Sequence, residues 1–496
     1  MTYERKGKGE PRDLLYLVDF NPAIMRIVLK AMLCVLSLFL LSNFKEKAPR
    51  KPYIIYLFTD QQHAGMMSCA GNKWVNTPAM DYIASHGIRF TRAYTTNPVC
   101  TPARISMMTG RFPSYFMDKT GKPVRENWGA GTVNSIPDDV KNHTVADYAR
   151  EAGYELIFGG KEHLPPGLRP DVLGFRDISD NEREELAKEA ANYIRSEHDK
   201  PYFMIVSLIN PHDICYMAIR DFAETSHDSL LLAKGETELA ELDRALNTPQ
   251  GISEEEFYSK FCPPLPANYE PQEGEPQAIK TLLNSRGFRD KARQRYSDKQ
   301  WRMHRWAYAR LTEVVDKEIQ VILDALKSNG DEENTLVMLS SDHGDMDSAH
   351  RMEHKSTLYE ESANIPFLAM WKGKIPGGQV DKTHLVSNGL DFLPTLCDYM
   401  GVSGGADPRG MSLRPLMEGK PVDWRKSLGV ESEVGKMVVS EDGFKYIHYD
   451  LGREEEQLID LNMDPYETTH FTNSKDHYQR LNDLRKAYQT SWFPAD

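Results

Sequence analysis

The sequence YIIYLFTDQQ, residues 53–62, joins a continuous apolar run to a polar end. Six apolar or aromatic residues in a row, without polar alternation, are typical of a strand that is buried on both faces of a parallel sheet. The polar residues Asp60 and Gln61 follow where this strand is expected to end. The pattern therefore predicts a central strand over 53–58, with chemically useful side chains at its carboxyl end.

Other segments also predict apolar strands that end in polar residues, and helices lie between them. Segments 77–94 and 144–164 each predict a helix followed by a strand. Apolar strands with polar ends are expected within 201–213 and 335–345, and a long amphipathic helix over 308–330 precedes the last of them. Strands that alternate with helices form a mostly parallel sheet covered on both faces. The sequence thus predicts an α/β fold, with a large mostly parallel sheet flanked by helices.

The remaining chain follows a different pattern. Residues 214–300 are acidic and proline-bearing with weak periodicity, and we interpret them as an insertion over the site, with a plain surface excursion as the alternative. After about residue 375, short antiparallel strands and a helix over 476–490 predict a smaller C-terminal α+β subdomain. The expected parts are an N-terminal extension (1–50), a catalytic domain (51–375) and the C-terminal subdomain (376–496).

Residues 25–44 have the layout of a secretory signal peptide. Met25 is followed by Arg26 and Lys30, and then by an apolar core over 31–41 that is short for a bilayer span. A buried N-terminal helix is the alternative interpretation. We expect a periplasmic or secreted protein, with no stable membrane span once the signal has been removed.

Charge and cysteine spacing exclude several classes of protein. The formal net charge is −13, and no basic run is long enough to indicate a nucleic-acid partner. An anionic substrate must therefore be captured by local cations or by a metal ion. The six cysteines are widely spaced without a C-x-x-C pair, so they indicate neither a disulfide framework nor a zinc ribbon.

Polar side chains at two predicted strand ends offer ligands for a metal ion. Asp60 and Gln61 follow one strand, and Asp342 and His343 follow another. In α/β sheets, ligands bind at the carboxyl ends of the strands. The oxygen ligands favour Ca²⁺ or Mg²⁺, and the imidazole leaves Mn²⁺ open. For a single one of these residues, a cap or turn role is an equally simple interpretation.

Cationic side chains are expected near the same edge of the sheet. Lys161, His163 and His212 follow predicted strands, and Lys355 comes shortly after the second metal pair. A lone lysine is usually solvated. Two lysines and a metal around one point suit a charged oxyanion ester.

Cys100 lies in the polar stretch TTNPVCTPARISMMTGRFP, residues 95–113. A catalytic thiol needs a histidine partner, and no local pattern names one. For the cysteine by itself, a buried structural role is the simpler interpretation. Its neighbours in sequence favour a catalytic role instead, because CTPAR at 100–104 resembles the C-x-P-x-R signature of the type I sulfatases, in the alkaline-phosphatase-like superfamily.

The resemblance extends over roughly residues 53–470, with the motifs in the family's order. The further matching stretches are MMTGR, TDQQ, NTPAMDYIASHGIRFTRAY, GYELIFGGKEHL, NPHD, SSDHGD, KSTLYEESANIPF, DFLPTL, GMSLRPLMEG and LIDLNMDPYE. The pentapeptide alone is moderately specific, and the ordered set is highly specific.

The resemblance implies a modified nucleophile and a metal ion. A maturation enzyme would convert Cys100 to formylglycine, whose hydrated aldehyde attacks sulfur and expels the alcohol. The second hydroxyl then loses its proton, and sulfate leaves. Asp60, Gln61, Asp342 and His343, joined by the modified Cys100, would bind the metal, with Ca²⁺ expected and Mg²⁺ or Mn²⁺ as alternatives.

Further roles follow from matching positions in the motifs. Arg104 would hold the formylglycine hydrate and the metal-site carboxylates. Lys161 and Lys355 would bind sulfate oxygens, and His163 would hydrogen-bond the diol. His212 would protonate or orient the leaving oxygen, since an alkoxide is a poor leaving group.

Two positions depart from the common family pattern. Gln61 occupies a position where many sulfatases have a second Asp, and His343 one where Asn is common. The combination also resembles the phosphonate monoester hydrolases and phosphodiesterases of the superfamily. We expect a sulfatase acting on a sulfated carbohydrate, with those phosphorus-ester hydrolases as the alternative. A catalytically inactive sulfated-glycan-binding protein is disfavoured by the intact set of cationic residues.

Overall fold

A computed structural model describes residues 51–496, except 128–130, 132, 134, 405–406, 454 and 493–496. The signal peptide expected over 25–44 lies outside the described residues and stays a prediction. Among the helices of the described part, none is both long enough and apolar enough to cross a membrane.

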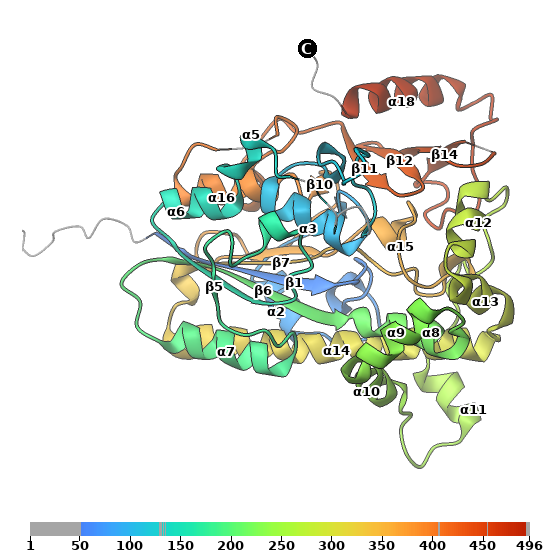
Figure 1. The fold of residues 1–496 in the computed structure, drawn as a ribbon, viewed down its shortest axis with the longest axis horizontal. Coiled ribbons are helices and arrows are strands. Elements are labelled where there is room, and N and C mark those ends of the chain that lie inside the picture. The colour runs from blue at the N-terminus through green and yellow to red at the C-terminus, as the bar shows by residue number, and fades with distance from the viewer. Residues whose placement is uncertain are drawn as a thin grey trace, which may run out of the picture. The chain divides into compact units, whose positions relative to one another are not determined.

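A large sheet forms the centre of the molecule (Figure 1). Its eight strands lie in the order β5-β4-β6-β1-β7-β8-β2-β9. Their bounds are β1 (Tyr53–Asp60), β2 (Gly87–Phe90), β4 (Glu155–Gly160), β5 (Arg176–Asp177), β6 (Tyr202–Pro211), β7 (Thr335–Ser341), β8 (Phe367–Met370) and β9 (Gln379–Asp381). In this sheet β8 is antiparallel to both of its neighbours, and the other pairs are parallel. The predicted mostly parallel sheet is confirmed.

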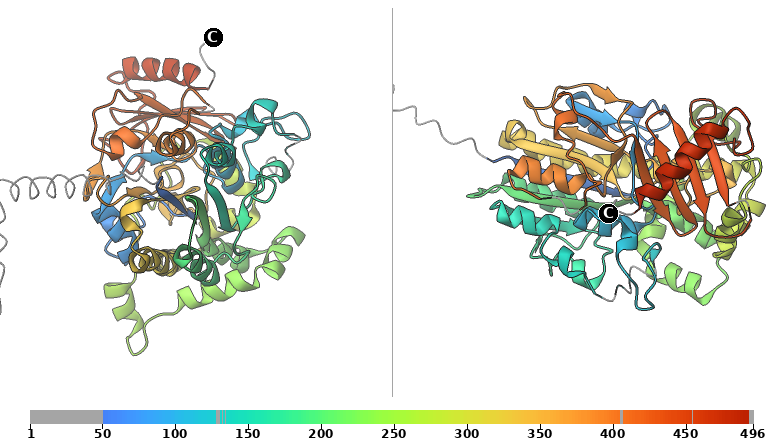
Figure 2. Two further views of the ribbon diagram at one scale, coloured as in Figure 1. Left: turned by 90° about the vertical axis from the view of Figure 1, so that its left-hand side faces the viewer. Right: turned by 90° about the horizontal axis from the view of Figure 1, so that it is seen from above.

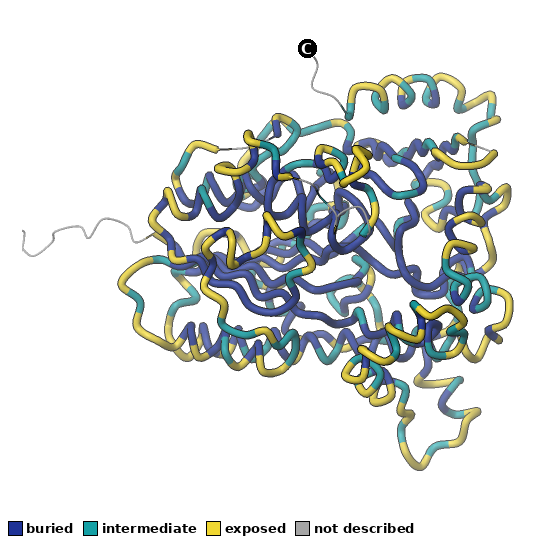
Figure 3. The backbone as a smooth tube through the Cα atoms, viewed as in Figure 1, coloured by how far each residue is buried: buried dark blue, intermediate teal, exposed yellow. Residues whose placement is uncertain are grey.

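Helices cover both faces of this sheet (Figure 2). On one face lie α2 (Pro78–Ser85), α7 (Glu184–Arg195) and α14 (Asp298–Asn329), and on the other α3 (Cys100–Thr109), α6 (Val145–Glu151) and α16 (Phe392–Met400). Side chains of β1 alternate between the two cores, with Tyr56 on one side and Leu57 on the other. The central strands are accordingly buried on both faces, as their apolar runs predict (Figure 3).

The long helix α14 begins earlier than predicted, at Asp298. Ser297 accepts a hydrogen bond from the Gln300 backbone, and the Gln300 side chain accepts one in return, which forms a capping box. The first turns carry several charged side chains that hide the apolar periodicity. The helix ends at Asn329, and Gly330 caps it with a positive φ of 77°, which suits glycine.

Much of the segment 214–300 is helical, although its sequence shows little periodicity. Its helices are α8 (Tyr216–Phe222), α9 (Ser226–Lys234), α10 (Glu236–Leu246), α11 (Glu254–Glu256), α12 (Gln277–Asn284) and α13 (Gly287–Arg295). They lie on the side toward which β1 and β6 point (Figure 1). The segment is therefore close to the edge where the predicted site residues gather.

A second, smaller sheet lies in the C-terminal part. It is antiparallel and consists of β11 (Ser427–Ser432), β12 (Gly435–Ser440), β13 (Phe444–Tyr449) and β14 (Glu456–Asp460), with α18 (Tyr478–Ser491) beside it. This confirms the predicted C-terminal antiparallel sheet. Both β9 and α16 lie past residue 375 and still pack with the large sheet, while the division into domains stays a prediction.

Further short elements lie between these parts. They are β3 (Ala93–Tyr94) paired with β10 (Val386–Ser387), and the short helices α5 (Asp138–Lys141), α15 (Glu360–Ala363) and α17 (Arg414–Met417).

Candidate active site

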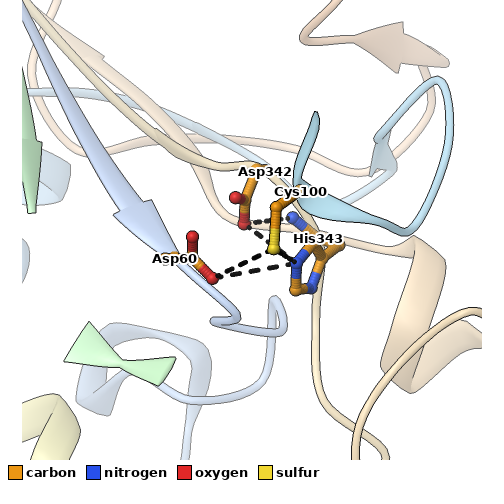
Figure 4. A group of neighbouring side chains, drawn as sticks. All are labelled: Asp60, Cys100, Asp342 and His343. Carbon is orange, nitrogen blue, oxygen red and sulfur yellow. Dashed lines mark hydrogen bonds and ion pairs between the residues drawn. The ribbon is translucent and has the colours of Figure 1, made fainter. Parts of the chain in front are cut away.

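The predicted metal ligands meet at the carboxyl edge of the large sheet. Strand β1 pairs directly with β7, so Asp60 lies next to Asp342 and His343. Cys100, the first residue of α3, joins them (Figure 4). One ligand atom from each of these four buried residues lies within 4.8 Å of the others, and Cys100 Sγ is 3.1 Å from His343 Nε2.

The donor atoms of this cluster fit a divalent cation. Two buried carboxylates lie together, and like charges in a low dielectric repel strongly. Burial, and then the neighbouring charge of Asp60, raise the pKa of Asp342 above its usual value. Two carboxylate oxygens and an imidazole nitrogen suit a hard or borderline metal ion, which would relieve this repulsion.

Gln61 lies beside the cluster with its amide already hydrogen-bonded. Its Oε1 accepts from Lys355 Nζ at 2.7 Å and from Cys215 Sγ at 2.9 Å. Its Nε2 donates to Asp345 Oδ2 at 2.7 Å. The structure thus brings Gln61 to the site, and its coordination of a metal stays a prediction.

Arg104 bridges the carboxylates of Asp60 and Asp342. Its guanidinium donates to Asp342 Oδ2 at 3.1 Å and to Asp60 Oδ2 at 3.0 Å. It also donates to the Lys161 carbonyl and to Ser207 Oγ. The side chain is 1% exposed, so these contacts replace its hydration shell.

Two lysines give the surroundings of Cys100 a positive potential. Lys355 Nζ lies 3.2 Å from Cys100 Sγ, and Lys161 Nζ lies 2.6 Å from Asp60 Oδ2. Burial is the largest influence on the Cys100 thiol and raises its pKa. The opposing charges of Lys355, Lys161 and His343 nevertheless hold that pKa well below the usual value. An environment that favours an anion at this sulfur also favours a bound oxyanion.

His212 and His163 line the same cavity as Lys355. Burial, followed by the charges of Lys161 and Lys355, holds the pKa of His212 well below its usual value. Its Nδ1 is buried, with no hydrogen-bond partner in the described part of the chain. His163 is exposed and has a left-handed backbone, with φ 45°. It therefore lies at the rim of the site, and its contact with a diol stays a prediction.

The sequence interpretation missed several residues around this cavity, which has a volume of about 320 Å³. Asp345, inside the quoted SSDHGD motif, orients Gln61. Cys215 follows His212 by one short helical turn and also holds Gln61. Arg286 and Arg289 reach the cavity from the start of α13, a helix that periodicity did not predict.

Family comparison agrees with this geometry. The model of the Sulfatase family matches residues 52–402, and the model "N-sulphoglucosamine sulphohydrolase, C-terminal" matches residues 348–491. The chain belongs to the sulfatase family, within the alkaline-phosphatase-like superfamily, and is an enzyme of the sulfatase class.

Individual relatives are similar over most of this chain. A Delta 4,5-hexuronate-2-O-sulfatase of Bacteroides thetaiotaomicron is 26% identical, over 85% of this chain and 84% of its own length. The solved structure of a 2-O GAG sulfatase has a TM-score of 0.73 and 25% identity, covering 89% of this chain and 91% of that one. The phosphonate monoester hydrolase of Agrobacterium radiobacter has a TM-score of 0.64 at 20% identity, covering 89% and 95%. The last likeness shows a shared fold, so the fold alone does not separate sulfur from phosphorus esters.

Proposed function

We propose that this sulfatase releases sulfate from a sulfated carbohydrate, with a formylglycine made from Cys100 as the nucleophile. The observation that carries the proposal is the position of Cys100, buried against His343 and Lys355 within the carboxylate cluster. An ordinary buried cysteine would have apolar neighbours. Here, Asp60, His343 and Lys355 lie against one sulfur.

The metal would be held by Asp60, Asp342 and His343, with Gln61 and the modified Cys100 completing the set. Ca²⁺ is the proposed ion, with Mg²⁺ or Mn²⁺ as alternatives. A divalent cation beside a hydrated aldehyde supplies an activated oxygen nucleophile at neutral pH.

The side chains of the protein account for the binding and proton steps. Lys161 and Lys355 would neutralise the sulfate oxygens, and the contacts of Arg104 keep the carboxylates in place. His212 is held neutral by burial and by the lysines, so an arriving anion would raise its proton affinity. It could then protonate or orient the leaving oxygen, while His163 contacts the diol from the rim.

The substrate class is proposed from two relatives and from the cavity. Those relatives are named for hexuronate and GAG sulfates, and the cavity beside Cys100 has the size of a small-molecule site. The helices of segment 214–300 supply part of its wall. Export by the signal peptide would bring the enzyme to such saccharides in the periplasm or outside the cell.

The test combines peptide mass and turnover. The chain is produced with a formylglycine-generating enzyme, the peptide containing Cys100 is weighed, and sulfate release is measured on sulfated saccharides. Cys100→Ala should abolish turnover with the fold intact, whereas Cys69→Ala, at a half-buried cysteine in another part of the fold, should retain activity. Near wild-type turnover by Cys100→Ala would refute the nucleophile.

A second candidate is a phosphonate monoester or phosphodiester hydrolase with the same nucleophile. Gln61 and His343 favour it, because the pairs Asp60–Gln61 and Asp342–His343 resemble the combination found in those hydrolases. Turnover of phosphorus esters at higher efficiency than sulfate esters would support this alternative.

A further inference from the structure

The cavity beside Cys100 has a second cationic wall that the proposed mechanism does not use. Arg286, the N-cap of α13, and Arg289, in its first turn, line the cavity together with Lys355 and His212. None of the described residues that line it is an aspartate or a glutamate. In a protein with a net charge of −13, a pocket without carboxylates is a distinct electrostatic feature.

Arg289 differs from the other cations of the site, because its charge has no partner among the residues that the structure describes. Among the residues that the structure describes, it makes no ion pair and no side-chain hydrogen bond, and its Nε is buried. Burial lowers the pKa of its guanidinium, and Glu433, Cys215 and Asp345 act on it only through space. Desolvating an unpaired cation is costly, so a ligand that supplies the missing charge would be favoured.

The rest of the wall suits a sugar. Phe288 lies between the two arginines in sequence, lines the cavity and packs beside the His354 ring, with centroids 5.3 Å apart. Leu231 and Ile219 add apolar surface. A guanidinium binds carboxylate and sulfate oxygens through its planar fork, whereas apolar walls contact the ring.

We propose that Arg289, aided by Arg286, binds a second anionic group of the substrate, a uronate carboxylate or a second sulfate, while Lys355 holds the sulfate that is cleaved. The inference rests on the proposed function, since it concerns the same cavity. It narrows the substrate class to saccharides with two negative groups within the reach of one small cavity. Arg289 is then a specificity residue outside the catalytic group.

The first test compares three saccharides that share the scissile sulfate. One is otherwise neutral, one carries a carboxylate, and one carries a second sulfate. Wild-type protein with aldehyde at Cys100 should prefer one of the two dianionic substrates. That preference shows whether the second anionic group is a carboxylate or a sulfate. Arg289→Gln should lower kcat/KM on that substrate about 10- to 100-fold, and on the neutral substrate no more than about threefold.

The matched control is Arg295→Gln, which removes the same charge from an exposed position on the same helix. It should leave all three efficiencies within about twofold of the wild type. Equal losses on all substrates in Arg289→Gln, or a wild type without preference for a second anion, would overturn the inference.

The second test does not depend on turnover. Protein that retains the unmodified Cys100 is titrated with the same three saccharides by calorimetry. Tighter binding of a dianionic saccharide, lost in Arg289→Gln and kept in Arg295→Gln, supports the pocket even if no sulfate ester is hydrolysed. Equal binding of all three saccharides would contradict it. Absence of turnover with the aldehyde confirmed would instead count against the proposed function.

Discussion

Replacing Arg104 with methionine removes the cation that bridges the carboxylates of Asp60 and Asp342. The guanidinium is 1% exposed and donates to both Asp60 and Asp342, at 3.0 and 3.1 Å. Removing one partner of a buried ion pair typically costs about 3–5 kcal/mol, since the other charge stays buried without compensation. Lys161 Nζ still pairs with Asp60 Oδ2, at 2.6 Å. We therefore expect the free energy of unfolding to fall by the lower end of this range, about 3 kcal/mol.

The assay is urea unfolding in the presence of a chelator, so that no metal replaces the lost cation. Arg111→Met is the matched control, because Arg111 pairs with a half-exposed Asp139 and should lose less than about 1 kcal/mol. Adding a divalent ion should recover part of the loss in Arg104→Met. A folded Arg104→Met variant within about 1 kcal/mol of the wild type, without metal, would refute the reasoning.

Three further predictions concern rate, leaving group and pH. Lys355→Ala should lower kcat/KM on sulfate esters about 100-fold, through both kcat and KM, because a buried cation beside Cys100 is lost; an unchanged kcat would mean that this lysine lies away from the reacting sulfate. His212→Gln should slow saccharide sulfates about 10²- to 10⁴-fold and activated aryl sulfates far less, since only a poor leaving group needs the proton; equal losses would remove the acid role. Burial raises the pKa of Glu318 to about 8. Between about pH 4.5 and 8 its carboxyl is therefore protonated in the folded protein and ionised in the unfolded chain, so the free energy of unfolding falls as pH rises through that window. Glu318→Gln should therefore exceed the wild type by roughly 2–4 kcal/mol at pH 8 and match it near pH 5, measured by urea unfolding.

The strand-tip residues could be predicted because parallel topology constrains them. An apolar run that ends in polar residues predicts both a buried strand and its functional end, and adjacent strands bring such ends to one edge. Asp60, Asp342 and His343 meet for this reason. Cys100 lies on a helix, so strand patterns gave no position for it, and only the family motif brought it into the site.

The second cationic wall could not be predicted from the sequence, and the reason is physical. Arg289 lies in α13, a short helix in which only Phe288 and Ala292 are buried among charged residues, so its apolar periodicity is weak. Cys215 lies in the short helical turn before α8. Which of their side chains faces the cavity depends on how α8 and α13 pack against each other, and a linear pattern does not contain that information. The early start of α14 was missed for a related reason, since charged residues fill its first turns.

The central claim is that the metal cluster and the modified Cys100 cleave sulfate esters of saccharides. The most direct test measures kcat/KM of protein with a confirmed aldehyde at Cys100, in Ca²⁺ and in Mn²⁺. The substrates are sulfated mono- and disaccharides, phosphodiesters and phosphonate monoesters. Our account predicts the highest efficiency on a sulfated saccharide. Higher efficiency on a phosphorus ester would contradict it and would identify Gln61 and His343 as the residues that set the substrate.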